Sequence, residues 1–346
     1  MRQSHKWIQR IIGFVVLIVL VNALSLQLGL KYWMPRANGR TLNVYVYQRQ
    51  EIQTDVLIVG SSRILRALTP SIVEDELSGA LSRPFTAYNV GQFGTRVIAN
   101  SLVMKDVLAS NTAPRIVVFE VSVGALHSRR GDLQDGLRYY ASLGDLVRST
   151  RWWITSPGCA AAAAAGSFRG FSNLFFYGHH LPFPHGLNRG LEKIQQRGGG
   201  VYGAGEPTGG RLSDLTLAAR QKKIRNLQSQ RRFWETQTGE IGGPPEQAFR
   251  RVCRLVHESG AKLVVLNPPL TQEFREQVYP EILRREYARY LTQAAGSEGF
   301  EYRDLDAEVT HLSEDDFLDF GHLNEVGSRK VSAYTAREVL LPLLEE

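Results

Sequence analysis

The chain has 346 residues, of which 43% are hydrophobic and 22% charged, and this composition excludes a largely disordered protein. It is long enough for one large domain, or for one domain with a sizeable insertion. The formal net charge is +7, but no nucleic-acid-binding motif accompanies it, so we expect no nucleic-acid partner and a bias towards acidic surroundings such as lipid headgroups or anionic glycans.

An apolar segment near the N-terminus predicts a membrane anchor. Basic residues within 1–10 precede the apolar residues 11–30, and that stretch is close to the ~20 residues needed to span a bilayer. The basic flank keeps the short N-terminus in the cytoplasm. We therefore expect a single-pass protein with residues 31–54 as a linker and residues 55–346 as an extracytoplasmic domain, either periplasmic or extracellular.

A cleaved signal peptide is the alternative for this segment. Val21, Asn22 and Ala23 resemble a small-residue cleavage site. The apolar character continues beyond that site to Leu30, which favours a retained anchor. Both alternatives place the remainder of the chain outside the cytoplasm.

Residues 55–121 predict alternating strands and helices. The apolar run 55–60 ends in glycine and is typical of a strand buried on both faces. The next expected elements are a helix from Pro70, a strand at 85–90, a helix at 97–109 and a strand at 115–121. This order predicts a parallel sheet covered by helices, that is, a three-layer α/β/α sandwich of the flavodoxin-like kind.

Residues 125–245 interrupt the alternation and are interpreted as an insertion. They hold an alanine run at 160–165, an aromatic-rich patch at 168–183 and a glycine-rich stretch at 198–210. The alternation then resumes. The expected elements are a helix at 246–259, a strand at 261–266, a helix at 272–296, a strand at 300–304 and a helix at 325–341 with Asn324 as its N-cap.

Three loops carry side chains suited to chemistry. In a parallel sheet, ligands gather at the carboxyl ends of the strands. The loop at 60–63 supplies two serines, the loop at 89–94 supplies glycine amides, and the loop at 319–322 supplies an aspartate and a histidine. We expect these three loops to meet at one edge of the sheet.

These motifs resemble those of the SGNH (GDSL-like) hydrolase superfamily, especially its membrane-associated branch acting in envelope polysaccharide or teichoic-acid acylation. The resemblance implies that Ser62 is the nucleophile of the first block. It implies that the amides of Ser62 and Gly91 form the oxyanion hole. It also implies that Asp319 and His322 are the closing Asp-x-x-His block, in which His322 takes the proton of Ser62 and Asp319 orients the imidazole.

The sequence departs from the family pattern at two places. Ser61 stands where the family often has aspartate, and residues 120–124 lack the asparagine of the third block. A missing oxyanion donor could cost about 3 kcal/mol of transition-state stabilisation. Ser122 is a candidate replacement, and Asp304 and Asp306 are alternative partners for the histidine.

Other reactive side chains have structural interpretations. Arg63 is expected to pair with a carboxylate, and the two serines before it could simply cap a helix. The histidines His179, His180 and His185 fit no familiar ligand spacing, so we expect no metal and no cofactor. Cys159 and Cys253 could form a disulfide or remain two unpaired cysteines.

The function expected from this pattern is an extracytoplasmic O-acyltransferase or esterase that works through an acyl-serine. Its partners would be an envelope polysaccharide or another acylated acceptor, and a membrane protein that delivers the acyl group. Two alternatives stay open. One is a non-catalytic assembly or glycan-binding protein that retains the fold, and the other is a secreted lipase or esterase.

Overall fold

The computed structural model describes part of the chain, namely residues 13 and 16 and the ranges 53–92, 95–108, 114–127, 211–236, 241–279 and 281–345. The predicted anchor, the linker up to residue 52, the cleavage site and most of the predicted insertion lie outside the described residues. Among the helices that fall within these ranges, none is long and apolar enough to cross a membrane.

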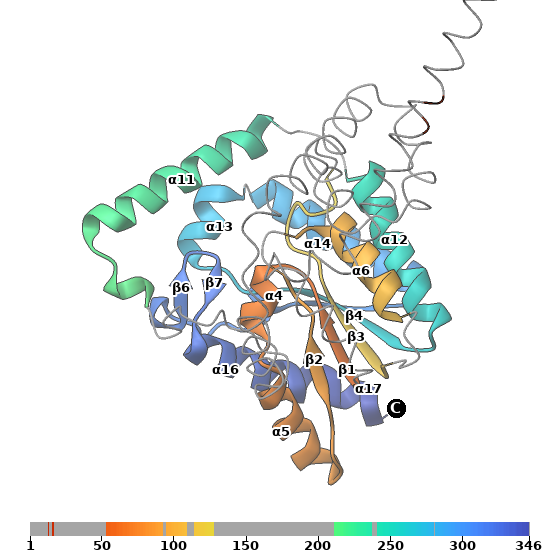
Figure 1. Ribbon diagram of the computed structural model, residues 1–346. Coiled ribbons are helices and arrows are strands. Elements are labelled where there is room, and N and C mark those ends of the chain that lie inside the picture. The colour runs from red at the N-terminus through yellow and green to blue at the C-terminus, as the bar shows by residue number, and fades with distance from the viewer. Residues whose placement is uncertain are drawn as a thin grey trace, which may run out of the picture.

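The described residues contain a five-stranded sheet in which every neighbouring pair is parallel (Figure 1). Its order is β2-β1-β3-β4-β5. The strands are β1 (Val56–Val59), β2 (Ala87–Asn89), β3 (Ile116–Glu120), β4 (Lys262–Asn267) and β5 (Glu301–Asp304). The predicted parallel sheet is confirmed, with strand bounds that differ from the expected ones by one or two residues.

Burial explains the composition of the central strands. All residues of β1 and β3 are buried, and both strands are apolar except for Glu120 at the end of β3. A strand covered by helices on both faces must be apolar on both faces, so its sequence forms a continuous run rather than an alternation. Register places Val59 beside Phe119, so β1 and β3 end side by side.

Helices cover both faces of the sheet, which gives the expected three layers (Figure 1). On one face, α5 packs against α16 and the end of β2, while on the other α12 packs against α6, α14 and β4. These helices are α5 (Pro70–Leu81), α6 (Val97–Leu108), α12 (Gly243–Glu258), α14 (Glu281–Glu298) and α16 (Glu325–Tyr334). Each presents apolar residues to the sheet.

Two of the expected helices are divided in the structure. The helix expected at 272–296 is two helices, α13 (Gln272–Val278) and α14, and the sequence has Pro280 between them. Proline interrupts a helix because it lacks an N–H group and clashes with the preceding turn. The last helix continues from α16 as a π-helical turn, η5 (Thr335–Leu340), and ends as α17 (Leu341–Glu345).

A small antiparallel hairpin lies just before α16. Its strands, β6 (Phe317–Asp319) and β7 (His322–Leu323), were expected to be a loop. Asp319 is the register partner of His322. Asn324 follows the hairpin and is the N-cap of α16, as predicted, because its side chain accepts hydrogen bonds from the amides of Val326 and Gly327.

The ends of the predicted insertion meet in space. His127 forms an isolated antiparallel bridge with Ile241, and the amide of Gly242 donates to the carbonyl of Leu126 at 3.3 Å. One long helix of this segment is described, α11 (Leu217–Thr236), and it packs against α13 beside the hairpin (Figure 1).

Candidate active site

Ser62 is the first residue of α4 (Ser62–Ala67), and only Gly60 and Ser61 separate it from the end of β1. Ser61 is the N-cap of this helix, and its hydroxyl accepts a hydrogen bond from the amide of Arg63 at 3.1 Å. The strand-to-helix turn therefore places Ser62 at the carboxyl edge of the sheet, where parallel α/β proteins bind their ligands.

The structure brings Ser62, His322 and Asp319 into one chain of hydrogen bonds. The distance from Ser62 Oγ to His322 Nε2 is 2.8 Å. The other ring nitrogen, His322 Nδ1, lies 2.9 Å from Asp319 Oδ1 and 3.1 Å from Oδ2. A hydroxyl, an imidazole and a carboxylate in this order are the parts of an acyl-transfer triad.

Asp319 is held in its ionised form. Burial opposes ionisation, but the hydrogen bond and charge of His322, the amide of Gly321 and the charge of Lys223 outweigh it and lower the pKa of Asp319 to about 2. Gly321 donates its amide to Asp319 Oδ1 at 2.9 Å. An ionised carboxylate here fixes the orientation of the ring and stabilises an imidazolium when one forms.

The two alternative partners of the histidine lie elsewhere. Asp304 accepts a hydrogen bond from the Asn267 amide group at 2.8 Å. Asp306 accepts from the Leu270 amide at 2.7 Å and pairs with Arg275 at 3.1 Å. Neither of them contacts His322, so the structure places Asp319 alone in that position.

The expected contribution of Gly91 to an oxyanion hole is wrong in this structure. The Gly91 amide donates to Asn89 Oδ1 at 2.8 Å and is buried. The Nδ2 group of Asn89 donates to the carbonyl oxygens of Ile64 and Leu68. The hydrogen bonds of Asn89 thus connect β2 to α4. They also engage the Gly91 amide that was expected to bind the oxyanion of the substrate. Ser62 N–H has no hydrogen-bond partner among the described residues and stays an oxyanion donor candidate.

Ser122 does not replace the missing asparagine. Its hydroxyl donates to Glu120 Oε1 at 2.5 Å. The same carboxylate accepts hydrogen bonds from the Ser61 amide at 2.6 Å and from the Ser61 hydroxyl at 2.8 Å. Glu120 is 4% exposed. Its hydrogen bonds to Ser61 connect the end of β3 to the turn that carries Ser62.

Glu120 was missed by sequence reasoning, although one signal was present. It is the single charged residue in the otherwise apolar run of β3, and a buried charge requires hydrogen-bonding partners. Gly60 explains why the turn can approach it. A Cβ atom on Gly60 would lie 2.5 Å from Glu120 Cβ, so only glycine fits between the two strands.

Arg63 does not form the expected ion pair with any described carboxylate. Its guanidinium donates to the Tyr279 hydroxyl at 3.3 Å and lies over the rings of Phe274 and Tyr279. The side chain is half-buried. The expectation of a carboxylate partner is therefore wrong, because aromatic rings occupy the positions beside the guanidinium.

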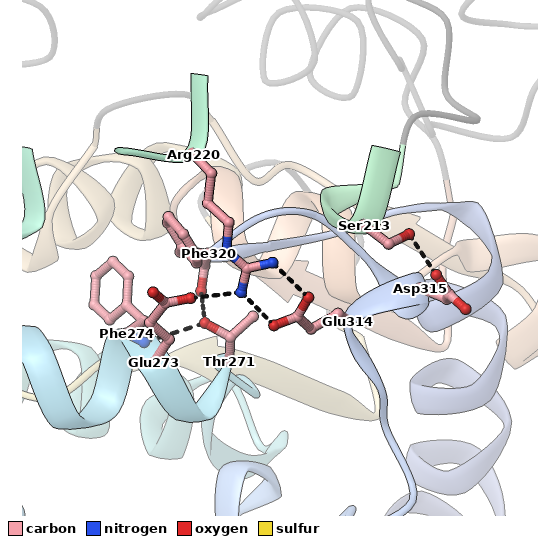
Figure 2. Close-up of polar contacts among 8 residues, drawn as sticks. All are labelled: Ser213, Arg220, Thr271, Glu273, Phe274, Glu314, Asp315 and Phe320. Atoms are coloured by element: carbon pink, nitrogen blue, oxygen red, sulfur yellow. Dashed lines mark hydrogen bonds and ion pairs between the residues drawn. The ribbon is translucent and has the colours of Figure 1, made fainter. Parts of the chain in front are cut away.

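Arg220 of helix α11 forms ion pairs with two glutamates on other segments (Figure 2). The guanidinium pairs with Glu273 of α13 at 2.9 Å and with Glu314 at 2.5 Å, just before the hairpin. It also lies 5.9 Å from the ring centroid of Phe320, which sits between Asp319 and His322 in the sequence. Arg220 thus joins α11, α13 and the turn that carries the histidine.

No group of three or more metal-binding side chains occurs in the described part of the chain. His179, His180 and His185 lie outside it. Cys253 is a free, buried cysteine on α12, and burial raises the pKa of its thiol to about 12. Cys159 also lies outside the described residues.

No protein-family model matches this chain, and no curated protein matches it. Among solved structures, it is similar to the lipase/acylhydrolase from Enterococcus faecalis at 12% sequence identity and a TM-score of 0.37. The match covers 83% of this chain and 95% of that one. A TM-score this low supports no conclusion about fold or function, which rest on the chain's own geometry.

Proposed function

We propose that this chain is a serine-dependent enzyme that transfers or hydrolyses acyl groups, with Ser62 as nucleophile. One observation carries the proposal, namely the 2.8 Å contact between Ser62 Oγ and His322 Nε2. A serine hydroxyl is a poor nucleophile unless an adjacent base takes its proton. Asp319, on the far side of the ring, supplies the charge that such a base needs.

The reaction proceeds in two steps. Ser62 Oγ attacks the carbonyl carbon of an ester while its proton passes to His322 Nε2, and the alcohol leaves with that proton. The Ser62 amide stabilises the oxyanion of the intermediate. Water or a second hydroxyl then attacks the acyl-serine, His322 takes its proton, and Ser62 is released with its proton restored.

The finer function combines this site with the N-terminal sequence. The protein is an SGNH-type acyltransferase or esterase, anchored in the membrane by residues 11–30, and acts outside the cytoplasm on O-acyl groups of an envelope polysaccharide or exopolysaccharide. Support comes from the basic and apolar pattern of residues 1–30 and from the order of the motifs around Ser62 and His322. A membrane protein delivers the acyl group when a sugar hydroxyl is the acceptor.

A non-catalytic assembly or glycan-binding role is the second candidate, and a specific observation favours it. The Gly91 amide and the Ser122 hydroxyl, the two donors expected beside Ser62, both bind other groups. Loss of one oxyanion donor typically lowers kcat by about 100- to 1,000-fold. A triad without a second donor would therefore be a weak catalyst.

Covalent labelling separates the two candidates. A fluorescent alkyl phosphonate should label full-length wild-type protein at Ser62, and Ser62→Ala should remove the label. Hydrolysis of p-nitrophenyl acetate should fall to background in Ser62→Ala and in His322→Ala. The double variant should be hardly slower than either, because triad members act as one unit. Absence of labelling in a folded wild-type protein would exclude the catalytic function.

Ser332→Ala is a suitable control for these variants. Ser332 is a buried serine of α16 whose hydroxyl donates to the carbonyl of Ala67 and accepts from the amide of Thr69. Its substitution removes a buried hydroxyl without removing a triad member. Loss of labelling in this control equal to that in Ser62→Ala would indicate that the assay reports folding rather than nucleophile chemistry.

A further inference from the structure

Arg63 presents a positive charge beside the nucleophile. It is the next residue after Ser62, in the first turn of α4. Its guanidinium carbon lies 5.0 Å from the centroid of the Phe274 ring and 6.0 Å from that of Tyr279, and its Nη2 group donates to the Tyr279 hydroxyl. Two rings and one hydrogen bond therefore fix its orientation.

The Arg63 guanidinium has N–H donors beyond the one that binds Tyr279. It carries five N–H donors, and within the described part of the chain only Tyr279 accepts from one of them. The nearby acids that interact with its charge are Glu120 and Asp306. Both are committed elsewhere, since Glu120 binds Ser61 and Ser122 while Asp306 pairs with Arg275. A half-buried charge without a direct counter-ion is costly unless a partner arrives.

The guanidinium also borders the turn that carries the histidine. A Cβ atom on Gly321 would lie 3.9 Å from Arg63 Nε, and Gly321 is adjacent to His322. A second cation, Lys223 of α11, acts on Asp319 from the other helix that borders this turn. Arg63 and Lys223 thus bring two positive charges to the turn that carries the histidine.

We propose that Arg63 binds a carboxylate of the substrate and makes the Ser62 site selective for anionic esters. The planar fork of arginine matches the two oxygens of a carboxylate, and such charge-assisted pairs are about twice as strong as neutral hydrogen bonds. The rings of Phe274 and Tyr279 hold the fork in place before substrate arrives, which lowers the entropy lost on binding. This inference rests on the proposed acyl-transfer function and names the substrate class of that site.

Matched esters test the inference on the full-length protein. The first pair carries the charge on the acyl side, p-nitrophenyl hemisuccinate against p-nitrophenyl pentanoate. The second pair carries it on the alcohol side, meta-acetoxybenzoate against meta-acetoxybenzamide. We expect wild type to prefer the anionic member by about tenfold in kcat/KM in at least one pair, as one charge-assisted contact predicts.

Arg63→Gln should abolish this preference, mainly by raising KM for the anionic ester. Arg63→Lys should retain part of it, because it keeps the charge but loses the fork. Arg289→Gln is the control for net charge, since Arg289 is an exposed residue of α14. Thermal unfolding of each variant shows whether it is folded.

Two outcomes would overturn the proposal. Wild type could show no preference for the anionic ester in either pair, or Arg63→Gln could slow both members of each pair equally, which is the result of a structural role alone. Binding of meta-hydroxybenzoate, measured by calorimetry on Ser62→Ala with and without Arg63→Gln, does not depend on catalysis. Equal affinities in that measurement would contradict the proposal even if wild type hydrolyses none of the esters, whereas inactivity alone would contradict the proposed function.

Discussion

Glu120 fixes the direction of the nucleophile without contacting it. Its carboxylate accepts the amide and the hydroxyl of Ser61, and that hydroxyl in turn caps α4. Ser122 supplies a third donor. All of these groups donate hydrogen bonds, and the two carboxylate oxygens of Glu120 accept them. A change at Glu120 should therefore move Ser62 relative to His322.

Glu120→Gln should lower kcat with little change in KM. The carboxylate accepts from four donors, which are the amide and hydroxyl of Ser61, the hydroxyl of Ser122 and the amide of Ile64. The amide group of glutamine would face at least one of them, and an unsatisfied buried donor costs about 1 to 3 kcal/mol. Steady-state kinetics with p-nitrophenyl acetate and thermal unfolding measure the two effects. Ser122→Ala is the matched control, because it removes one donor and leaves the carboxylate intact, so it should cost less. An unchanged kcat in Glu120→Gln would contradict the positioning role.

Ser62 and Gly91 differ in how well their roles could be predicted from the sequence. Ser62, Asp319 and His322 stand out because their residue types fit one reaction and their motifs follow strand ends. The use of the Gly91 amide could not be predicted, because the Asn89 side chain two residues earlier reaches it. A side chain's hydrogen-bond partner depends on rotamers and neighbours, which motif order does not specify.

At the scale of elements, Arg220 of α11 contacts Glu314, just before the β6–β7 hairpin, and Phe320 in its turn (Figure 2). Isolated surface ion pairs contribute about 0 to 1 kcal/mol each. Arg220 is only 30% exposed and joins Glu273, Glu314 and the Phe320 ring at once. Such a network is stronger than its separate pairs, because one ordered side chain serves all of them.

Arg220→Gln should loosen α11 and the hairpin together. Amide hydrogen exchange should rise in residues 217–236 and 317–323, because both lose the guanidinium that joins them. The control is Arg285→Gln, which removes an exposed ion pair with Glu281 inside α14 and should leave exchange in both segments unchanged. Faster exchange in α11 alone would show that the hairpin does not depend on this contact.

Element boundaries were predictable where a local signal marks them. Asn324 caps α16 as expected, since a cap acts on amides two and three residues away. The hairpin was not expected. Its strands have three and two residues, too short for a periodic pattern, and their pairing is stabilised by contacts with α16 and α4.

At the scale of the whole molecule, sheet order creates the site. The chain runs from β1 to β2 on one side and from β3 through β4 to β5 on the other. The reversal lies between β1 and β3, and ligands bind outside such switch points in open parallel sheets. Ser62 follows β1 and Glu120 ends β3, so the contacts around the nucleophile form at this point.

Asp306 should make stability depend on pH. Burial raises its pKa to about 6 although Arg275 lies 3.1 Å away, against about 3.9 for an unfolded chain. Because the folded pKa is raised, this group's stabilising contribution is full below about pH 4 and is lost as the pH rises through about 6. The shift corresponds to roughly 2 to 3 kcal/mol.

Asp306→Asn should remove this dependence. Urea unfolding at about pH 4 and about pH 8 should show the stability of wild type relative to the variant falling by roughly 2 to 3 kcal/mol between the two. Asp315→Asn is the control, because Asp315 is an exposed aspartate. A constant difference across this range would contradict a raised pKa at Asp306.

Local patterns in the sequence were enough to predict the fold class and the residue types of the candidate site. Apolar runs ending in glycine, separated by helical patterns, leave few alternatives to a parallel sheet, and such a sheet gathers its loops at one edge. The hydrogen-bond donors that remain for a substrate could be identified only from tertiary contacts. Glu120 and Arg63 have their roles because elements distant in sequence bring Ser61 and Tyr279 within hydrogen-bond reach, and no local pattern encodes those distances.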